Sequence, residues 1–313
     1  MLATEYWQQN AGNSMMAMQR QMPLRGTLSH NEPMSKHTSW RVGGVADCYY
    51  QPADIEDLAN YLSQLTATDE ITWVGLGSNL LVRDGGIRGS VIATSGVLNN
   101  LEKRANNIIR AESGVACAKV ARFAARQSLQ SAEFLAGIPG TMGGALAMNA
   151  GAFGGETWDI VSAVETVNRN GDLRRRMPDE FQIAYRSVHG PVDEWFVAAE
   201  LTLPSGDAGV SLAKIKQYLS KRSDTQPIQQ PNAGSVFRNP EGDYSARLIE
   251  ACGLKGRCEG GACVSDKHAN FIVNTGNATA ADIETLINRV AMIVEREQGV
   301  ALQREIRIVG EAL

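Results

Sequence analysis

The sequence predicts an α+β protein in which strands outnumber helices. In many short segments apolar and polar residues alternate, as they do in strands, whereas fewer segments place apolar residues at helical spacing. The two kinds of segment do not alternate regularly, as they would in a doubly wound parallel sheet. Two glycine clusters, over residues 75–86 and 137–156, each follow an apolar segment. We therefore expect strand-rich modules that carry glycine loops at a ligand site.

The composition is that of a large globular chain with nearly balanced charge. The 313 residues are 43% hydrophobic, which is enough for two or three domains with real cores. Lys and Arg number 30 against 34 Asp and Glu, so no basic excess favours nucleic acid or an anionic membrane. No apolar run reaches the roughly twenty residues that a membrane helix requires. We expect a cytoplasmic protein whose partners are small molecules.

Besides Met1, the first thirty residues carry four methionines, but they lack the apolar core and cleavage site of a secretory signal. These methionines are Met15, Met16, Met18 and Met22. We interpret residues 1–30 as an N-terminal arm without an assigned function.

The cysteines are odd in number, in a chain too large to need disulfide bonds for its stability. They are Cys48, Cys117, Cys252, Cys258 and Cys263. Reduced thiols in a cytoplasm are the simplest interpretation. Cys258, Cys263 and His268 match no standard zinc spacing and lack a fourth ligand, so we expect no metal.

The elements of the first half are predicted from their periodicity. Strands are expected at residues 48–52, 71–74, 80–82, 89–94 and 107–112, and helices at residues 54–64 and 119–128. The first helix begins near Asp54, a good capping residue, and its apolar residues share one face.

The glycine cluster at residues 75–86 lies between two predicted strands. Amides and the short side chains of Ser78 and Asn79 would be directed at one point, which suits a pyrophosphate. No helix follows, so this is not the dinucleotide-binding fingerprint of Gly-x-Gly-x-x-Gly, and a plain hairpin remains open. Upstream, Arg41 precedes the glycine pair Gly43-Gly44 and offers a guanidinium to an anion, which alone is a weak signal.

The central stretch at residues 137–156 holds seven glycines and almost no charge. Such a run can take positive φ angles and admit a bulky ligand at main-chain distance. A solvated linker would be the alternative. The apolar residues in the stretch and its lack of serine and lysine favour the wall of a cofactor site.

Further strands are predicted at residues 160–167, 173–176 and 195–201, and a closing strand at 302–310. Helices are predicted at residues 212–222, 245–251 and 280–297, and a loop with a strand at 260–274. A shift in composition at residues 204–209 is interpreted as a domain boundary. Arg186 follows Tyr185 near the end of a strand, where a rim salt bridge and a place in a pocket are equally open.

Two polar residues of the second half are candidates for chemistry. Ser235 follows Ala233-Gly234, where the chain can bend sharply, and no histidine or lysine adjoins it. A hydrolytic nucleophile is therefore disfavoured, and proton donation to a carbanion or enolate is the alternative. Glu305 alternates with arginines on the closing strand, so it is either an exposed ion pair or a carboxylate facing a pocket.

In this order, the motifs resemble the UDP-N-acetylenolpyruvoylglucosamine reductase family, from about residue 31 to residue 310. The motifs are Thr38-Ser39-Trp40-Arg41-Val42-Gly43-Gly44, Gly75-Leu76-Gly77-Ser78-Asn79, Gly137-Ile138-Pro139-Gly140 through Asn149-Ala150-Gly151, Tyr185-Arg186, Ala233-Gly234-Ser235 with Asn239, and Glu305. One glycine motif would be weak evidence, but six in register are specific.

The resemblance implies an FAD-binding module similar to that of p-cresol methylhydroxylase, followed by a substrate-binding α+β domain. The module would span residues 31–204, with α+β subdomains at about 31–95 and 96–204, and the second domain residues 205–313. FAD would lie between the subdomains. The implied cofactor-binding residues are Arg41, Gly75, Leu76, Gly77, Ser78, Asn79, Leu80, Gly137, Ile138, Pro139, Gly140, Thr141, Gly144, Asn149, Gly151 and Ala152.

The implied activity is reduction of UDP-N-acetylglucosamine enolpyruvate to UDP-N-acetylmuramate, in peptidoglycan precursor synthesis. NADPH would reduce the flavin and leave, and the flavin N5 would then give hydride to the second reactant. Arg186 and Glu305 would polarise the carboxylate of that reactant, and Ser235 would deliver the proton.

Tyr185, Arg238 and Asn239 are the implied substrate-binding residues. A lysine that precedes the Ala-Gly-Ser turn in longer members of the family is missing here, which indicates the shorter subtype. The contacts to uridine diphosphate are therefore open. Lys221, Arg222, Arg238 and Asn239 are the candidates.

Two other functions compete. Another FAD-dependent oxidoreductase of this fold, acting on a sugar or hydroxy acid, would leave Ser235 and Glu305 without a role. A non-catalytic flavin or nucleotide-sugar binding protein would leave Arg186 without one as well. The sequence does not reveal the oligomeric state, and a monomer is our working expectation.

Overall fold

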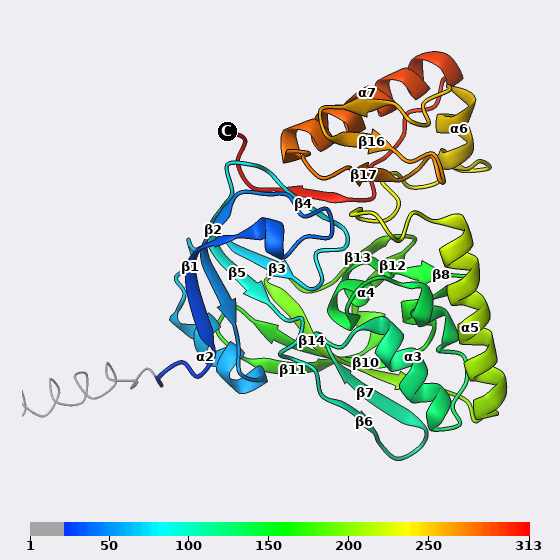
Figure 1. The fold of residues 1–313 in the computed structure, drawn as a ribbon. Coiled ribbons are helices and arrows are strands. Elements are labelled where there is room, and N and C mark those ends of the chain that lie inside the picture. Colours follow the sequence, from blue (N-terminus) through cyan, green and yellow to red (C-terminus); the bar gives the residue numbers. More distant parts are fainter. Residues whose placement is uncertain (1–21) are drawn as a thin grey trace, which may run out of the picture.

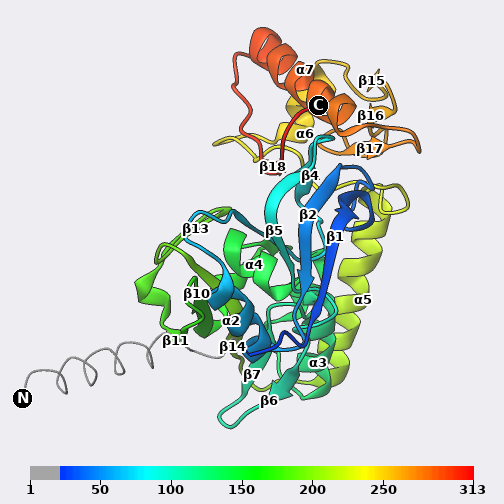
Figure 2. The ribbon, with the colours of Figure 1, turned by 90° about the vertical axis from the view of Figure 1, so that its left-hand side faces the viewer.

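The computed structural model describes residues 22–313, so residues 1–21, with most of the expected arm, lie outside the described residues. Figure 1 shows two α+β parts side by side, in blue to cyan and in green, and a smaller part in orange and red stacked on one end. Figure 2 shows the same stacking after a quarter turn. Within residues 22–313 no helix is long and apolar enough to cross a membrane.

The first subdomain is a mixed four-stranded sheet in the order β1-β2-β5-β3. Its strands are β1 (Thr27–Pro33), β2 (Val45–Gln51), β5 (Ile87–Ala93) and β3 (Ile71–Val74). The predicted helix is confirmed as α2 (Ile55–Gln64), with Asp54 accepting a hydrogen bond from the Asp57 amide. Because β1 begins at Thr27 and pairs with β2, residues 27–30 belong to this sheet and not to an arm reaching residue 30.

The strand after the first glycine cluster, β4 (Leu80–Val82), does not return to β3. It pairs in parallel with β18 (Arg307–Val309), near the other end of the chain. This pairing excludes the hairpin alternative for residues 75–86. The closing strand is shorter than the predicted residues 302–310, because residues 302–306 leave the sheet toward the C-terminal part.

The second subdomain is a five-stranded antiparallel sheet in the order β11-β10-β14-β7-β6. Its strands are β6 (Leu101–Lys103), β7 (Ile108–Glu112), β10 (Val161–Asn168), β11 (Leu173–Arg176) and β14 (Glu194–Thr202). The predicted helix is found as α3 (Cys117–Arg126). The central glycine stretch contains a helix that was not predicted, α4 (Met142–Met148). Two small hairpins complete this part, β8 (Gly151–Ala152) with β9 (Gly155–Glu156), and β12 (Gln182–Ala184) with β13 (Ser187–His189).

Helix α5 (Ala208–Thr225) packs along α3, as Figure 1 shows. Its Ile215 is buried in the core of the second subdomain. The predicted boundary at residue 204 therefore falls before a helix that packs with the FAD-binding module. The polar segment at residues 204–209 is the turn into α5, and Asp207 is the N-cap of this helix. It is not the point at which the chain passes from one hydrophobic core to the next.

The C-terminal part is built on α6 (Ser245–Ala251), as predicted, and on α7 (Ala280–Gln298). They pack with the antiparallel strands β15 (Cys258–Glu259), β16 (Ala262–Val264) and β17 (Ile272–Asn274). Thr279 caps α7, and Gly299 ends it with a φ of 70°, a conformation that glycine adopts without strain.

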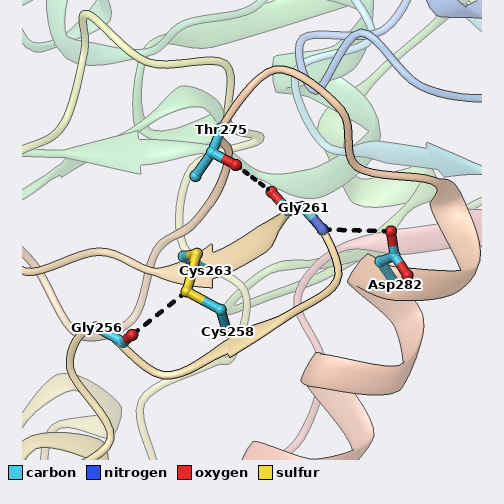
Figure 3. The surroundings of a disulfide bond; sticks show 6 residues. All are labelled: Gly256, Cys258, Gly261, Cys263, Thr275 and Asp282. Carbon is cyan, nitrogen blue, oxygen red and sulfur yellow. Dashed lines mark hydrogen bonds between the residues drawn. A yellow bond between two sulfur atoms is a disulfide. The ribbon is translucent and has the colours of Figure 1, made fainter.

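Two cysteines of this part form a disulfide bond, which corrects the expectation that all thiols are reduced. Cys258 and Cys263 lie directly opposite each other in the β15–β16 hairpin, with Cα atoms 4.1 Å apart (Figure 3). The sequence gives their separation but not the tight turn that brings them together. Asp282 of α7 accepts a hydrogen bond from the Gly261 amide in this turn.

Candidate active site

A cavity of about 800 Å³ lies where the three parts meet, and its size is typical of a ligand site. The first subdomain contributes the end of β3 and the glycine loop that follows. The second contributes the central glycine stretch and the end of α5. The C-terminal part contributes residues 233–235 and the segment leading into β18.

The two glycine loops touch each other across this cavity. A Cβ atom on Gly75 would lie 2.5 Å from Thr141 Oγ1, and one on Gly77 would lie 2.0 Å from the carbonyl oxygen of His37. Gly77 also has a φ of 61°. Glycine is needed here because two backbone segments and a ligand would share the space.

Four buried side-chain polar atoms have no hydrogen-bond partner among residues 22–313, and three of them belong to residues that line the cavity. These three are Trp73 Nε1, Ser113 Oγ and Thr141 Oγ1. Buried polar groups are almost always paired, so unpaired ones in residues that line a cavity agree with a bound group that brings polar atoms to this wall. A long, polyphosphorylated cofactor such as FAD fits this wall of glycines, hydroxyls and one indole N–H.

Most of the expected cofactor-binding residues line this cavity. They are Gly75, Leu76, Gly77, Ser78, Asn79, Leu80, Gly137, Ile138, Pro139, Gly140, Thr141, Gly144, Gly151 and Ala152. Arg41 lines a smaller neighbouring cavity instead. Asn149 is buried behind the wall, where its side chain donates to Glu156 and accepts from the Trp158 amide. It ends α4 in the left-handed conformation and supports the wall.

Arg186 and Glu305 form an ion pair at the cavity, 119 residues apart in sequence. Arg186 Nε donates to Glu305 Oε1 at 2.9 Å, and Arg186 Nη2 donates to the carbonyl oxygen of Gly151 at 3.2 Å. The two interpretations of Arg186 therefore coincide, because it makes a salt bridge that lines the pocket. Arg186 takes a φ of 54° at the hairpin turn, which is unusual for a residue with a side chain.

Burial raises the pKa of Glu305, and the positive charges of Arg186 and Arg238 only partly offset this shift. Arg238 lies behind the pair, where its Nη2 donates to the carbonyl oxygen of Arg186 at 3.0 Å. Its Nε is buried without a partner among the described residues. The Glu305 carboxyl can thus be held in place by an arginine and still be protonated more readily than an exposed glutamate.

Ser235 is held next to this pair by the backbone. The Glu305 amide donates to the carbonyl oxygen of Val236 at 2.8 Å, and Gly234 makes the bend before the serine with a φ of 76°. Asn270 fixes the following residues, accepting from the Phe237 amide at 3.0 Å and donating to the Phe237 carbonyl at 2.8 Å. Ser235, Arg186 and Glu305 all line the same cavity.

The expected substrate-binding residues are less directly placed. Tyr185 is exposed, and the guanidinium of Arg186 lies 5.0 Å from its ring centre. Asn239 is exposed, and its side chain accepts from the Ser245 amide at the start of α6. Neither residue lines the main cavity.

Some residues of the site carried no signal in the sequence. Trp73 lies in β3, and Ser113 directly follows β7. Both line the cavity, although nothing distinguishes the sequence of either strand from an ordinary one. Arg222 lines the cavity from α5, and Asn270 acts from a loop. Of these, the sequence singles out only Arg222, a basic residue shortly before the Ala-Gly-Ser turn.

Two family models match the chain. One is described as FAD binding domain and covers residues 46–176, and the other as UDP-N-acetylenolpyruvoylglucosamine reductase, C-terminal domain, and covers residues 226–309.

Curated relatives named UDP-N-acetylenolpyruvoylglucosamine reductase match over nearly the full length. The protein of Nitrosococcus oceani is 58% identical over 92% of this chain and 97% of its own. The protein of Methylococcus capsulatus is 59% identical over 93% of this chain and 95% of its own. The crystal structure of UDP-N-acetylenolpyruvylglucosamine reductase from Thermus caldophilus superposes with a TM-score of 0.78 at 31% identity, covering 91% of this chain and 98% of that one. The chain therefore belongs to the UDP-N-acetylenolpyruvoylglucosamine reductase family and is an FAD-dependent oxidoreductase.

Proposed function

We propose that the protein reduces UDP-N-acetylglucosamine enolpyruvate to UDP-N-acetylmuramate, with NADPH as the source of electrons. The observation that carries the proposal is the convergence of Ser235, Arg186 and Glu305 on the cavity of an FAD-binding module. When bound, FAD accepts a hydride from one reactant and delivers it to the other. The protein would act in the cytoplasm. It would act as a monomer, since residues of one chain surround the cavity.

The glycine loops would hold FAD through their amides, and Ser113 and Thr141 would give their unpaired hydroxyls to it. Amide donors can bind a pyrophosphate without a lysine, which agrees with the neutral composition of both loops. Asn149 would contribute indirectly by fixing the chain before Gly151.

The ion pair would bind and polarise the substrate carboxylate. Reduction of the enolpyruvyl double bond places negative charge on the carbon beside this carboxylate, and a preorganised guanidinium stabilises such charge in a site shielded from water. Two carboxylates repel each other, so Glu305 would take up a proton when the substrate carboxylate binds, which its raised pKa favours. Arg238 would act as a positioning residue through its bond to the Arg186 carbonyl.

Ser235 would deliver the proton that completes the reduction. A serine hydroxyl is a weak acid, and only a strongly basic carbon such as that of an enolate makes the transfer feasible. Tyr185 would contact the substrate from the rim of the cavity, beside Arg186. A contact from Asn239 would require its side chain to release the Ser245 amide.

The test separates the two half-reactions by stopped-flow absorbance of the flavin. In Ser235→Ala, bleaching by NADPH should keep its rate, whereas reoxidation by the enolpyruvyl sugar should slow by about 10²-fold or more. Ser220→Ala, which removes an exposed hydroxyl from α5, is the matched control and should change neither rate.

Equal loss in both half-reactions would contradict the role of Ser235. A yellow protein that NADPH bleaches but the enolpyruvyl sugar does not reoxidise would indicate another FAD-dependent oxidoreductase.

A further inference from the structure

The disulfide bond between Cys258 and Cys263 lies in a part of the molecule that the proposed chemistry does not use. It joins the two strands of the β15–β16 hairpin (Figure 3), and neither cysteine lines the main cavity. The inference drawn from it rests on the proposed function, which places the protein in the cytoplasm. Cytosolic thiols are mostly kept reduced, and the disulfides found among them are usually transient and respond to redox conditions.

The turn of this hairpin keeps the two cysteines opposite each other without help from the bond between them. A Cβ atom on Gly260 would lie 2.4 Å from the Asp282 carboxyl group, and one on Gly261 would lie 2.3 Å from the Ala278 amide nitrogen. Thr275 donates to the Gly261 carbonyl oxygen from its amide at 3.0 Å and from its hydroxyl at 2.9 Å. Because the turn is packed in this way, the two thiols stay neighbours when the bond is open, and closing it again costs little chain entropy.

The bonded pair is also the most accessible of the cysteines. Cys258 is exposed and Cys263 partly exposed, so a small thiol can reach the pair at Cys258 and begin thiol–disulfide exchange. Cys117, by contrast, is completely buried, and burial raises its pKa to about 12, which disfavours the reactive thiolate. Burial also raises the pKa of Cys252, which is free.

The hairpin is continuous with the segment that places Ser235. Strand β16 pairs with β17, where Cys263 lies opposite Val273. Asn270 lies two residues before β17, and its carbonyl oxygen accepts a hydrogen bond from the Val236 amide at 2.9 Å. One pair of strands and one asparagine therefore connect the disulfide to the backbone beside Ser235.

We propose that Cys258 and Cys263 are a thiol–disulfide exchange site, through which low-molecular-weight thiols adjust the C-terminal part. To close the bond, one cysteine thiolate attacks an oxidised small disulfide, RSSR, and displaces one RS⁻. The second cysteine then attacks the mixed disulfide and displaces the other. Two protein thiols and one RSSR thus give one protein disulfide and two RSH, and two electrons pass from the protein to RSSR. An excess of RSH reverses both steps.

Opening the bond loosens β15, which is two residues long and pairs with β16 only through Cys258–Cys263 and Glu259–Ala262. Two thiol sulfur atoms cannot approach as closely as two bonded ones, so β15 moves away from β16. This weakens the small sheet whose other edge strand leads to Asn270. The open form is therefore less stable and slower in the half-reaction that needs Ser235, whereas the half-reaction with NADPH is unchanged.

The first test follows the thiols themselves and needs no turnover. The FAD-loaded protein is equilibrated with reduced and oxidised glutathione at several ratios, alkylated rapidly and analysed by mass spectrometry. Cys258 and Cys263 should be protected together, to an extent that rises with the share of oxidised glutathione. A pair that is alkylated even in oxidised glutathione alone, or that stays closed in excess dithiothreitol, would overturn the proposal. A failure of the enolpyruvyl sugar as substrate would not affect this result.

The second test compares the closed protein with a variant that cannot close, Cys258→Ser with Cys263→Ser. The variant should unfold at a temperature lower by about 2–5 °C. Its flavin should be reoxidised by the enolpyruvyl sugar about 3- to 10-fold more slowly and bleached by NADPH at the native rate, because only Ser235 is displaced. The native protein should match the variant when its bond is opened.

Cys252→Ser is the matched control, since it removes a free thiol from the same part of the molecule. It should keep the full difference between the open and closed forms. Equal reoxidation rates in the two forms, or a response to glutathione that survives in the double variant, would overturn the proposal.

Discussion

The C-terminal domain meets the two halves of the FAD-binding module through two different kinds of contact. Toward the first subdomain the contact consists mainly of backbone pairing and buried apolar surface, with the Arg83–Glu284 ion pair beside them. Strand β18 pairs with β4, and the completely buried Trp40 packs in the core of the C-terminal domain. Trp40 also donates its indole N–H to the carbonyl oxygen of Ile272 at 2.8 Å, and Asn274 Nδ2 donates back to the Trp40 carbonyl at 2.9 Å.

Toward the second subdomain the described contacts are mostly polar and surround the main cavity. Arg186 and Glu305 span this contact, and Arg238 reaches the carbonyl oxygen of Arg186. Lys267 donates to the carbonyl oxygen of Ser223 at the end of α5. We infer that the first contact fixes the domain, and that the second holds the groups that perform the chemistry. Substitutions at the two contacts should therefore separate stability from activity.

The largest effect is expected at the first contact. Trp40→Ala should lower the free energy of unfolding by about 3–5 kcal/mol, because it empties a buried site and leaves the Ile272 carbonyl unpaired. Denaturant unfolding of the FAD-loaded protein measures this. Tyr244→Ala, at a largely exposed residue, is the control and should change stability by less than about 0.5 kcal/mol. A loss as small as that of the control would show that Trp40 does not hold this contact.

An intermediate effect is expected at the second contact, and it depends on pH. Because the pKa of Glu305 is raised, its protonated form persists to higher pH than in an exposed glutamate. Affinity for the carboxylate substrate should fall by up to about tenfold per pH unit once pH rises above this pKa. Binding should take up a proton, which calorimetry detects as a dependence of the binding heat on the buffer.

Glu305→Gln should abolish both the pH dependence and the proton uptake. The stability of the fold should also decrease as pH rises, since the folded protein binds the Glu305 proton more tightly than the unfolded chain does. The contribution of Glu305 to stability is therefore lost as pH rises through its raised pKa. Proton release on substrate binding would contradict the assignment.

The smallest effect is expected from the ion pair at the first contact. Arg83 and Glu284 approach to 2.8 Å, but their side chains are 37% and 20% exposed. A double-mutant cycle with Arg83→Ala and Glu284→Ala should give a coupling of at most about 1 kcal/mol, because water and salt screen the pair. A coupling of several kcal/mol would show that the ion pair, and not Trp40, contributes most of the stability of this contact.

The sequence predicted those parts of the fold that depend on local patterns. Helices α2, α6 and α7 lie where they were predicted, because a regular apolar face is readable along the chain, and Asp54 caps α2 as expected. Helix α4 was missed, because glycine has low helix propensity and the stretch forms a helix only where Met142 and Leu146 are buried against the second subdomain.

Long-range features could not be predicted from patterns. The parallel pairing of β4 with β18 and the pairing of Cys258 with Cys263 depend on which segments meet in space. The same holds for the site. The glycine loops were recognisable by composition, whereas Ser113 and Asn270 act through the places that the fold gives them.

The parallel ladder between β4 and β18 also bears on how the protein is made. Leu81 and Val82 are completely buried, and Ile308 and Val309 lie opposite them. While the ribosome is still extending the chain, β4 has no neighbour on this side until residue 309 has left the exit tunnel. The second subdomain, whose strands lie between residues 101 and 202, can close earlier. The ladder between β4 and β18 is therefore completed last, although β4 is translated early, and the unpaired edge of β4 is open to aggregation until then.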